Sequence, residues 1–354
     1  FCLLGTVDFI VIMIGNKKIV HFLSASDRIN YGDLLFPIIF KKVAEKFKIE
    51  IDFYNYGIVK SDLSHFGALK TLSYKKFQKN VNKLGGTVVI GGGEVFFASW
   101  TTLYSFINKT FSNLLLNKYF KSFENKFHLS RRLLTDKEIK VPFCISSDEL
   151  QNKEVKIFYN SVGGGSLSSN SKLKSHIVKA LKDSSLISVR DLRTKENIEK
   201  LNINSARIVP DSALTMSDFF TNEILVDKSS IPEKIYSKKF IFIQIGRFKR
   251  PNNLKKFAQD LKKLSLKLNL EVILCPIGKA ARHEDDIVLK EICSFEKSFH
   301  YIEPKNIYDI MFLISISKIY IGTSLHGMIT AQSFNIPFVG LNRKIEKLEG
   351  YIKY

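Results

Sequence analysis

An imidazole and the small, hydroxyl-bearing residues of a tight turn occur together in residues 322–327, Gly-Thr-Ser-Leu-His-Gly. Residues 318–321 before them are β-branched and apolar, which is typical of a buried parallel strand. Thr323 or Ser324 can cap a following helix, and parallel sheets bind ligands where such helices begin. His326 is therefore placed to move a proton at that turn. A buried imidazole bonded to a neighbouring carbonyl fits the same spacing.

Two glycine runs end further predicted strands. Gly91, Gly92 and Gly93 stand before Glu94, and Gly163 and Gly164 close the apolar segment that starts at residue 156. Runs of this kind let a backbone approach a ligand closely. They also form tight turns in which φ is positive, and the sequence leaves both interpretations open.

Charged side chains follow other predicted strands. They are Arg190 and Asp211 in the first half of the chain and Arg247 and Lys279 in the second, while Asp33 closes the polar loop 24–33. A guanidinium binds oxyanions through two parallel hydrogen bonds, and a carboxylate can exchange protons. Asp33 and Asp211 can equally cap a helix and form a turn, and the second-half cations can be surface residues.

These residues are positioned by strands that alternate with helices. The predicted strands, with the turns that close them, are 19–23, 51–53, 87–94, 156–165, 186–191, 207–211, 240–245, 271–275, 300–302, 318–321 and 337–341. The predicted helices are 34–47, 69–84, one from near 194, 253–268, 286–294, 306–315 and one ending at 332. This alternation favours the α/β class, with two Rossmann-like domains whose parallel sheets face a central cleft.

A chain of 354 residues and 40.5 kDa favours two domains. The expected boundaries are an N-terminal extension at 1–17, a first domain at 18–225, a linker at 226–239 and a second domain at 240–354. Two-domain proteins of this plan commonly send a final helix back across the first domain. Residues 348–354 stop before such a helix could be completed, so a truncated second domain is expected.

The composition argues against a disordered chain and against a polytopic membrane protein. Hydrophobic residues at 45% and charged residues at 25% are ordinary for a soluble globular protein. A net charge of +20 attracts anionic lipid surfaces or phosphorylated substrates, yet no nucleic-acid-binding signature accompanies it. The four cysteines lack metal-ligand or disulfide spacing, which indicates a cytoplasmic protein. No catalytic metal is expected, because the acidic run after His283 opens a helix.

Several motifs occur in a familiar order along residues 18–341. They are Asn30-Tyr-Gly-Asp33, Gly91-Gly-Gly-Glu94, Ser188-Val-Arg-Asp191, Pro210-Asp211, the 322–327 turn and Pro337-Phe-Val-Gly-Leu341. Together they resemble the polysaccharide pyruvyl transferase family. The resemblance implies a GT-B-like fold and transfer of the enolpyruvyl unit of phosphoenolpyruvate to two sugar hydroxyls, giving a cyclic ketal and phosphate. It implies a saccharide or lipid-linked acceptor on the first domain, the donor mainly on the second, and no further cofactor.

The resemblance also assigns roles to residues. Arg190 matches the family's donor-binding arginine, and Leu325 with His326 matches its Leu-His pair. Ser324 stands where the family often has arginine; Arg247 and Lys279, which follow predicted strands of the second domain, are the candidates to replace that cation, unless they are surface residues. His326 would carry one proton transfer, and Asp33, Glu94 or Asp211 the other.

Two other functions fit the same plan. A nucleotide-sugar glycosyltransferase would need a nucleobase pocket and a glycine-rich diphosphate loop in the second domain. A non-catalytic scaffold of a polysaccharide assembly complex would use the basic surface to stay at the membrane.

Overall fold

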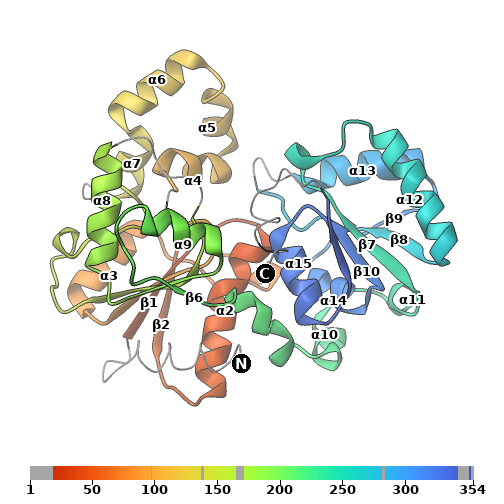
Figure 1. Cartoon of the computed structure of the whole chain (residues 1–354), viewed down its shortest axis with the longest axis horizontal. Helices are drawn as coiled ribbons and strands as arrows, with labels where there is room; N and C mark the ends of the chain where they lie inside the picture. Colours follow the sequence, from red (N-terminus) through yellow and green to blue (C-terminus); the bar gives the residue numbers. More distant parts are fainter. Residues whose placement is uncertain are drawn as a thin grey trace. The chain divides into compact units, whose positions relative to one another are not determined.

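The computed structural model describes residues 19–96, 98–136, 139–164, 171–280, 284–341 and Tyr351. The expected N-terminal extension, His283 and most of the chain end lie outside these residues. The chain forms two compact units, and the second contains Ala213–Tyr354 together with Ile29–Gly32 and His65–Gly67. Each unit holds a parallel sheet with helices beside it (Figure 1), so the predicted pair of Rossmann-like domains is confirmed. Within the described ranges, no helix has both the length and the apolar character that crossing a bilayer requires.

The sheet of the first unit has six parallel strands. Their order is β2 (Asp52–Tyr56), β1 (Ile19–Leu23), β3 (Thr87–Gly91), β4 (Lys156–Val162), β5 (Leu186–Val189) and β6 (Arg207–Ile208). Every neighbouring pair is parallel, so the loops that follow the strands leave from one edge of the sheet. That edge carries most of the predicted site residues.

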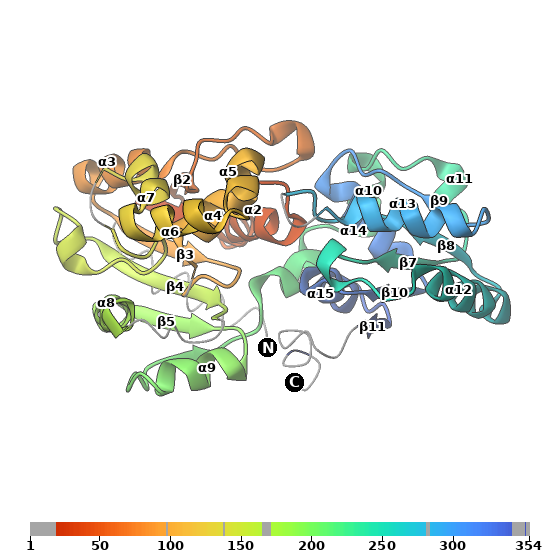
Figure 2. The same ribbon diagram turned by 90° about the horizontal axis from the view of Figure 1, so that it is seen from above.

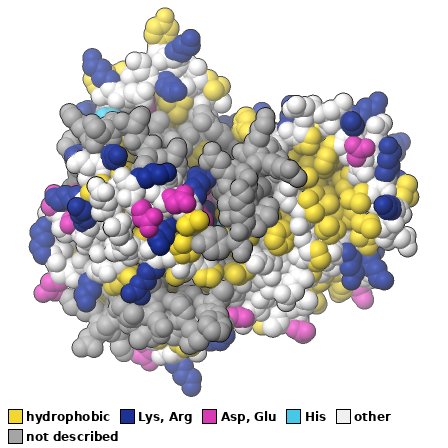
Figure 3. Space-filling view, in the orientation of Figure 1, with side chains coloured by type: hydrophobic (Ala, Val, Ile, Leu, Met, Phe, Trp, Pro, Cys, Tyr) yellow, Lys and Arg dark blue, Asp and Glu magenta, His cyan; other side chains and the backbone are white. Residues whose placement is uncertain are grey.

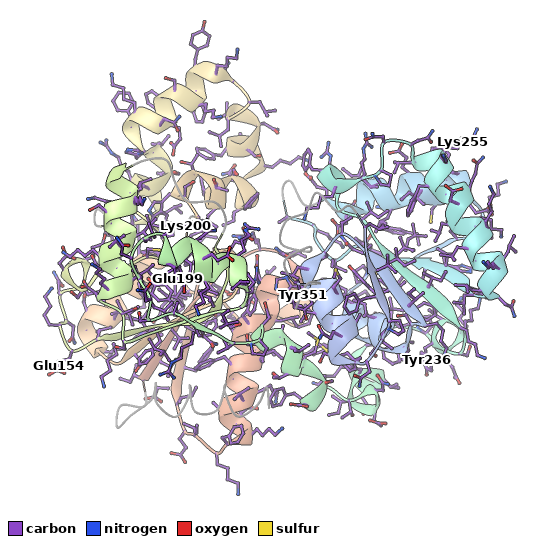
Figure 4. The ribbon with its side chains drawn as sticks, viewed as in Figure 1. Glu154, Glu199, Lys200, Tyr236, Lys255 and Tyr351 are labelled. Atoms are coloured by element: carbon purple, nitrogen blue, oxygen red, sulfur yellow. The ribbon has the colours of Figure 1, made fainter. Side chains whose placement is uncertain are left out.

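Alternating side chains of these strands face two layers of helices. Phe22 of β1 packs against Phe40 of α2 (Tyr31–Lys46), with ring centroids 5.2 Å apart. Val88 and Ile90 of β3 face a separate apolar cluster, to which α3 (Tyr74–Leu84), α8 (Ser171–Lys182) and α9 (Leu192–Glu199) contribute. The end of α9, where Glu199 and Lys200 lie, is labelled in Figure 4.

Four helices are inserted between β3 and β4. They are α4 (Trp100–Ile107), α5 (Lys109–Leu114), α6 (Lys118–Phe127) and α7 (Leu129–Leu134), and Figures 1 and 2 show them gathered at one side of the first unit. The side chains of Ser99, Asn108 and Asn117 cap the first three. None of these four helices was predicted from the sequence.

The second unit has five parallel strands in the order β11 (Phe338–Gly340), β10 (Ile319–Gly322), β7 (Phe240–Gln244), β8 (Glu271–Leu274) and β9 (His300–Tyr301). One face of β7, with Ile241 and Ile243, packs on α12 (Leu254–Leu268) and α13 (Asp285–Phe295). The helices α14 (Ile307–Ile316) and α15 (Leu325–Ser333) complete the unit, and they flank β10 in the chain.

The expected linker at 226–239 holds regular structure instead. It contains the end of α10 (Asn222–Lys228) and all of α11 (Glu233–Tyr236), and the second unit begins at Ala213. Leu225 and Ile231 are buried, and Asp309 of α14 accepts hydrogen bonds from the backbone N–H and hydroxyl of Ser230. These contacts tie the segment to the second unit, although its sequence shows little apolar periodicity.

The turn after β3 requires glycine for two separable reasons. Gly92 and Gly93 have φ values of 69° and 65°, and a Cβ on Gly92 would also lie 1.9 Å from the ring of Phe36. Gly93→Ala should therefore cost about 1 kcal/mol of unfolding free energy through backbone strain, and Gly92→Ala about 1–3 kcal/mol more. Denaturant unfolding of both variants measures the difference. Equal losses would contradict the close packing of Phe36.

Candidate functional site

A buried ion pair lies at the carboxyl edge of the first sheet. Arg190 follows β5 and Asp211 follows β6, and Nη1 of the arginine is 3.0 Å from Oδ2 of the aspartate. Both residues are buried. Burial disfavours the charge of the guanidinium, but Asp211, Glu94 and Asp191 overcome this and raise the pKa of Arg190. The result is a permanent cation fixed at the ends of adjacent strands.

The second glycine run makes room for this cation. A Cβ on Gly163 would lie 2.9 Å from both Nε and Nη2 of Arg190. The N–H of Gly164 donates to the hydroxyl of Thr194 at 2.8 Å, which ties the turn to α9. Gly163 has no positive φ, so its missing side chain serves the close approach of Arg190. The glycine thus admits the Arg190 side chain, and the predicted approach of this run to a ligand stays a prediction.

The first glycine run lies beside the second. The N–H of Gly163 donates to the carbonyl of Gly93 at 2.8 Å, and that of Val95 donates to the carbonyl of Gly163 at 3.0 Å. The positive φ values of Gly92 and Gly93 show that this run is a tight turn. Glu94 is partly exposed, and its Oε1 lies 3.7 Å from Nη2 of Arg193. The structure thus brings both runs, Glu94 and Arg190 to one edge.

Asp33 belongs to a second charged cluster of the first unit. Nη1 of Arg28 lies 3.3 Å from Oδ1 of Asp27, and Nη2 lies 3.5 Å from Oδ2 of Asp33. The same guanidinium lies 5.4 Å from the ring centroid of Phe106. Burial raises the pKa of Asp27, against the opposing effects of Arg28 and the N–H groups of residues 58 and 59. Asp33 is the third residue of α2, so it is not the N-cap. Sequence reasoning missed Arg28, for which the only signal was an Asp-Arg pair after a predicted strand.

In the second unit, His326 packs against a glycine from a distant motif. It is the second residue of α15, whose N-cap, Ser324, accepts a hydrogen bond from the N–H of Gly327 at 3.4 Å. A Cβ on Gly32 would lie 1.9 Å from Nδ1 of the imidazole, so the ring lies directly against the glycine. Leu325 is buried, while His326 is half-buried. The Asn30-to-Asp33 motif therefore supplies the surface on which the imidazole rests.

Two hydroxyls fix the backbone around His326. The hydroxyl of Thr330 donates to the carbonyl of His326 at 2.7 Å, and it lies 3.1 Å from the hydroxyl of Tyr31. Tyr31 is fully buried, and its N–H donates to the carbonyl of Ile277 at 3.0 Å. The first turn of α15 and the segment that carries Gly32 are thereby held together.

A buried polar network lies at the carboxyl edge of the second sheet, and sequence reasoning missed it. Gln244 at the end of β7 donates through Nε2 to Asp285 at 2.8 Å and accepts from the N–H of Thr323 at 3.1 Å. Asp285 also accepts from the N–H groups of Ile277 and Gly278. Burial raises the pKa of Asp285 to about 7 despite these hydrogen bonds. The only sequence signal for the network was a glutamine at the end of an apolar strand.

The two predicted cations of the second unit each contact a carboxylate. Arg247 lies 3.2 Å from Glu284 and 5.5 Å from the ring centroid of Phe248. Lys279 contacts Glu303. Each cation is therefore already compensated within its own unit. Among the described residues, no group of three or more His, Cys, Asp or Glu is arranged to hold a metal ion.

Comparison with known proteins gives one family and a fold. The family model described as polysaccharide pyruvyl transferase matches residues 30–344. A putative UDP-N-acetylglucosamine 2-epimerase from Listeria monocytogenes has a TM-score of 0.52 and 11% identity, over 95% of this chain and 82% of that one. The UDP-GlcNAc 2-epimerase of Methanocaldococcus jannaschii, in complex with UDP-GlcNAc and UDP, has a TM-score of 0.51 and 13% identity. That match covers 94% of this chain and 86% of the epimerase. Among curated protein sequences there is no significant match. At these identities, the structures show the shared GT-B-like fold alone.

The contact between Gly32 and His326 can be tested by adding one methyl group. Gly32→Ala suits a helical backbone, but its Cβ would overlap the imidazole, so unfolding free energy should fall by about 1–3 kcal/mol and the ring should move. Chemical denaturation and the NMR resonances of His326 measure the two effects. Gly246→Ala is the matched control, because its nearest contact would be an ordinary 3.5 Å. Unchanged stability and resonances in Gly32→Ala would contradict this packing.

Asp285 should make stability depend on pH in a defined window. Its pKa rises from the ordinary 3.8 to about 7, so the folded state binds more protons than the unfolded state between these values. Unfolding free energy should therefore decrease as pH rises through the window, by on the order of 4 kcal/mol. Asp285→Asn keeps an oxygen acceptor and should flatten this slope in denaturant titrations. Asp286→Asn, which removes a carboxylate 3.6 Å from Lys290, should leave it unchanged.

Proposed function

This chain belongs to the polysaccharide pyruvyl transferase family, and on that premise we propose that it transfers the enolpyruvyl group of phosphoenolpyruvate to two hydroxyls of a saccharide. The observation that carries the proposal is the family match over residues 30–344, which includes both Arg190 and His326. The acceptor is a surface polysaccharide or its lipid-linked precursor, and the reaction takes place in the cytoplasm. No cofactor beyond the donor itself is required.

Arg190 is proposed to bind the donor. Phosphoenolpyruvate carries a phosphate and a carboxylate, and a guanidinium binds such oxyanions with directed hydrogen bonds. The ion pair with Asp211 supports this role because it fixes the direction of the guanidinium before any ligand arrives. Asp211 is fully buried in that pair, so its proposed role is to position Arg190. Asp211 is therefore not the carboxylate that we propose for the second proton transfer, which leaves Asp33 and Glu94.

The reaction needs a proton delivered to the donor and protons removed from the sugar hydroxyls, and His326 is proposed to carry one of these transfers. A proton adds to the methylene carbon of the donor, and one sugar hydroxyl attacks the cationic carbon that results. The second hydroxyl then displaces inorganic phosphate and closes the ketal, and the hydroxyl protons leave to the base and to phosphate. An imidazole suits such transfers near neutral pH, and Asp33 is the carboxylate proposed for the other one.

Donor binding can be tested separately from turnover. Phosphoenolpyruvate at about a hundred times its dissociation constant should raise the unfolding free energy by roughly 2.7 kcal/mol, whereas UDP-GlcNAc should not. Arg190→Lys keeps the charge but loses the two-pronged geometry, so it should weaken donor binding by about tenfold or more. His326→Asn should retain binding and lose roughly a hundredfold or more in phosphate and ketal formation, measured with a saccharide extract as acceptor.

The same measurements separate the competing functions. Stabilisation by UDP-GlcNAc in place of phosphoenolpyruvate would favour a nucleotide-sugar enzyme. Full product formation by both variants would overturn the assigned roles. Lys255→Gln on α12, whose exposed side chain is labelled in Figure 4, is the control for charge loss away from the site and should change neither readout.

A further inference from the structure

The helix α6 of the inserted segment is anchored by a buried carboxylate. Its only buried residue is Glu124, which is 0% exposed and accepts hydrogen bonds from the hydroxyl of Thr101 at 2.9 Å and the N–H of Ser130 at 3.3 Å. A helix on the surface of a soluble domain ordinarily turns its apolar side inward. Here the glutamate anchors the inner side to α4 and α7, and the half-buried Phe120 packs its ring on the buried Phe111 at 5.7 Å between centroids, while the other aromatic side chains of the helix point outward.

The outward side of α6 carries aromatic residues. Tyr119, Phe123 and Phe127 are 87%, 47% and 41% exposed, and their four-residue spacing places them in one line along the helix. The rings of Phe123 and Phe127 lie 4.6 Å apart, so the line is continuous there. Leu116, in the turn just before α6, is 77% exposed. We call Tyr119, Phe123 and Phe127 the aromatic ridge. A line of exposed aromatic side chains of this kind indicates a surface that binds a membrane or another protein.

The surface around the ridge is basic. Between residues 109 and 134 the chain has six basic residues and one acidic residue, Glu124. The basic residues are Lys109, Lys118, Lys121, Lys126, Arg131 and Arg132. Because the one carboxylate is buried, the charged side chains that this segment exposes are all cationic. Figure 3 shows hydrophobic and basic side chains together over the outer end of the inserted helices, and Figure 4 shows side chains projecting outward from α6.

We propose that the inserted segment docks on an anionic lipid bilayer, with the aromatic ridge in the headgroup region and Lys118, Lys121 and Lys126 at the lipid phosphates. Aromatic rings next to cationic side chains are the composition that binds an interfacial helix to such a surface. Lys126 already lies 5.5 Å from the ring centroid of Phe127, so a cation and an apolar group meet at one point of the ridge. A second copy of the chain is a poor occupant, because it would bring two cationic surfaces together. The proposal does not depend on the identity of the donor.

Co-sedimentation of the full chain with vesicles tests the proposal. The wild type should bind vesicles of equal parts phosphatidylglycerol and phosphatidylcholine, and binding should weaken as salt rises. The triple variant Tyr119→Ser, Phe123→Ser, Phe127→Ser should lose about tenfold or more in binding, because it removes the groups that enter the headgroup region. Lys118→Gln, Lys121→Gln, Lys126→Gln should lose binding to anionic vesicles by a similar factor.

Matched variants and two further readouts keep the test decisive. The matched control is the double variant Leu266→Ser, Leu268→Ser on α12. It removes two apolar side chains that are 67% and 45% exposed and lie close in sequence to lysines, and it should bind vesicles as the wild type does. Denaturation should show that every variant still unfolds cooperatively, since each altered apolar side chain is at least 41% exposed. Wild-type binding by the triple variant, or equal binding to pure phosphatidylcholine, would overturn the proposal. A concentration-dependent dimer that the triple variant abolishes would assign the ridge to a second copy instead.

Discussion

Parallel pairing is the constraint on which both units of this protein depend. Because neighbouring strands run in the same direction, the residues that follow each strand are delivered to one edge of the sheet. In the first unit this gathers Asp33, Glu94, the two glycine runs, Arg190 and Asp211, which stand far apart in the sequence. In the second unit it gathers Gln244, Thr323 and Asp285. The packing that produces the sheets therefore also produces the polar edges where chemistry can occur.

Charges at these edges are held in place by partners at the edge of the same sheet. Arg190 is buried against Asp211, and Arg28 lies between Asp27 and Asp33. An uncompensated buried charge would be costly, so each cation is accompanied by a carboxylate that also fixes its direction. The consequence for function is preorganisation, since a guanidinium that is already oriented loses little freedom when an anion binds. Such preorganisation is what the proposed binding of phosphoenolpyruvate at Arg190 requires.

Much of this architecture could be predicted from sequence, and the exceptions have physical causes. Apolar runs that end at Leu23, Gly91 or Gly322 gave strand positions within a few residues, because a buried parallel strand leaves a dense local pattern. The contact between Gly32 and His326 could not be found that way, since both residues sit in polar turns and only tertiary packing joins them. Asp285 looked like a helix-dipole residue, and its burial beneath Gln244 depends on how α13 meets the sheet. The roles of Arg190 and His326 remain predictions of the resemblance and of the proposal.

The inserted helices show the limit of periodicity most clearly. In α6 the aromatic residues recur at helical spacing, and the pattern alone would turn them toward a core. The structure turns only Phe120 toward Phe111 and buries Glu124 beside it, because one carboxylate with several hydrogen-bond donors can hold a short helix against its neighbours. Periodicity reports that one side of a helix is apolar, but it does not say what covers that side. A helix that is anchored by a polar, well-bonded residue can carry apolar side chains on its outer side, and the proposed contact with a bilayer would account for Tyr119, Phe123 and Phe127 there.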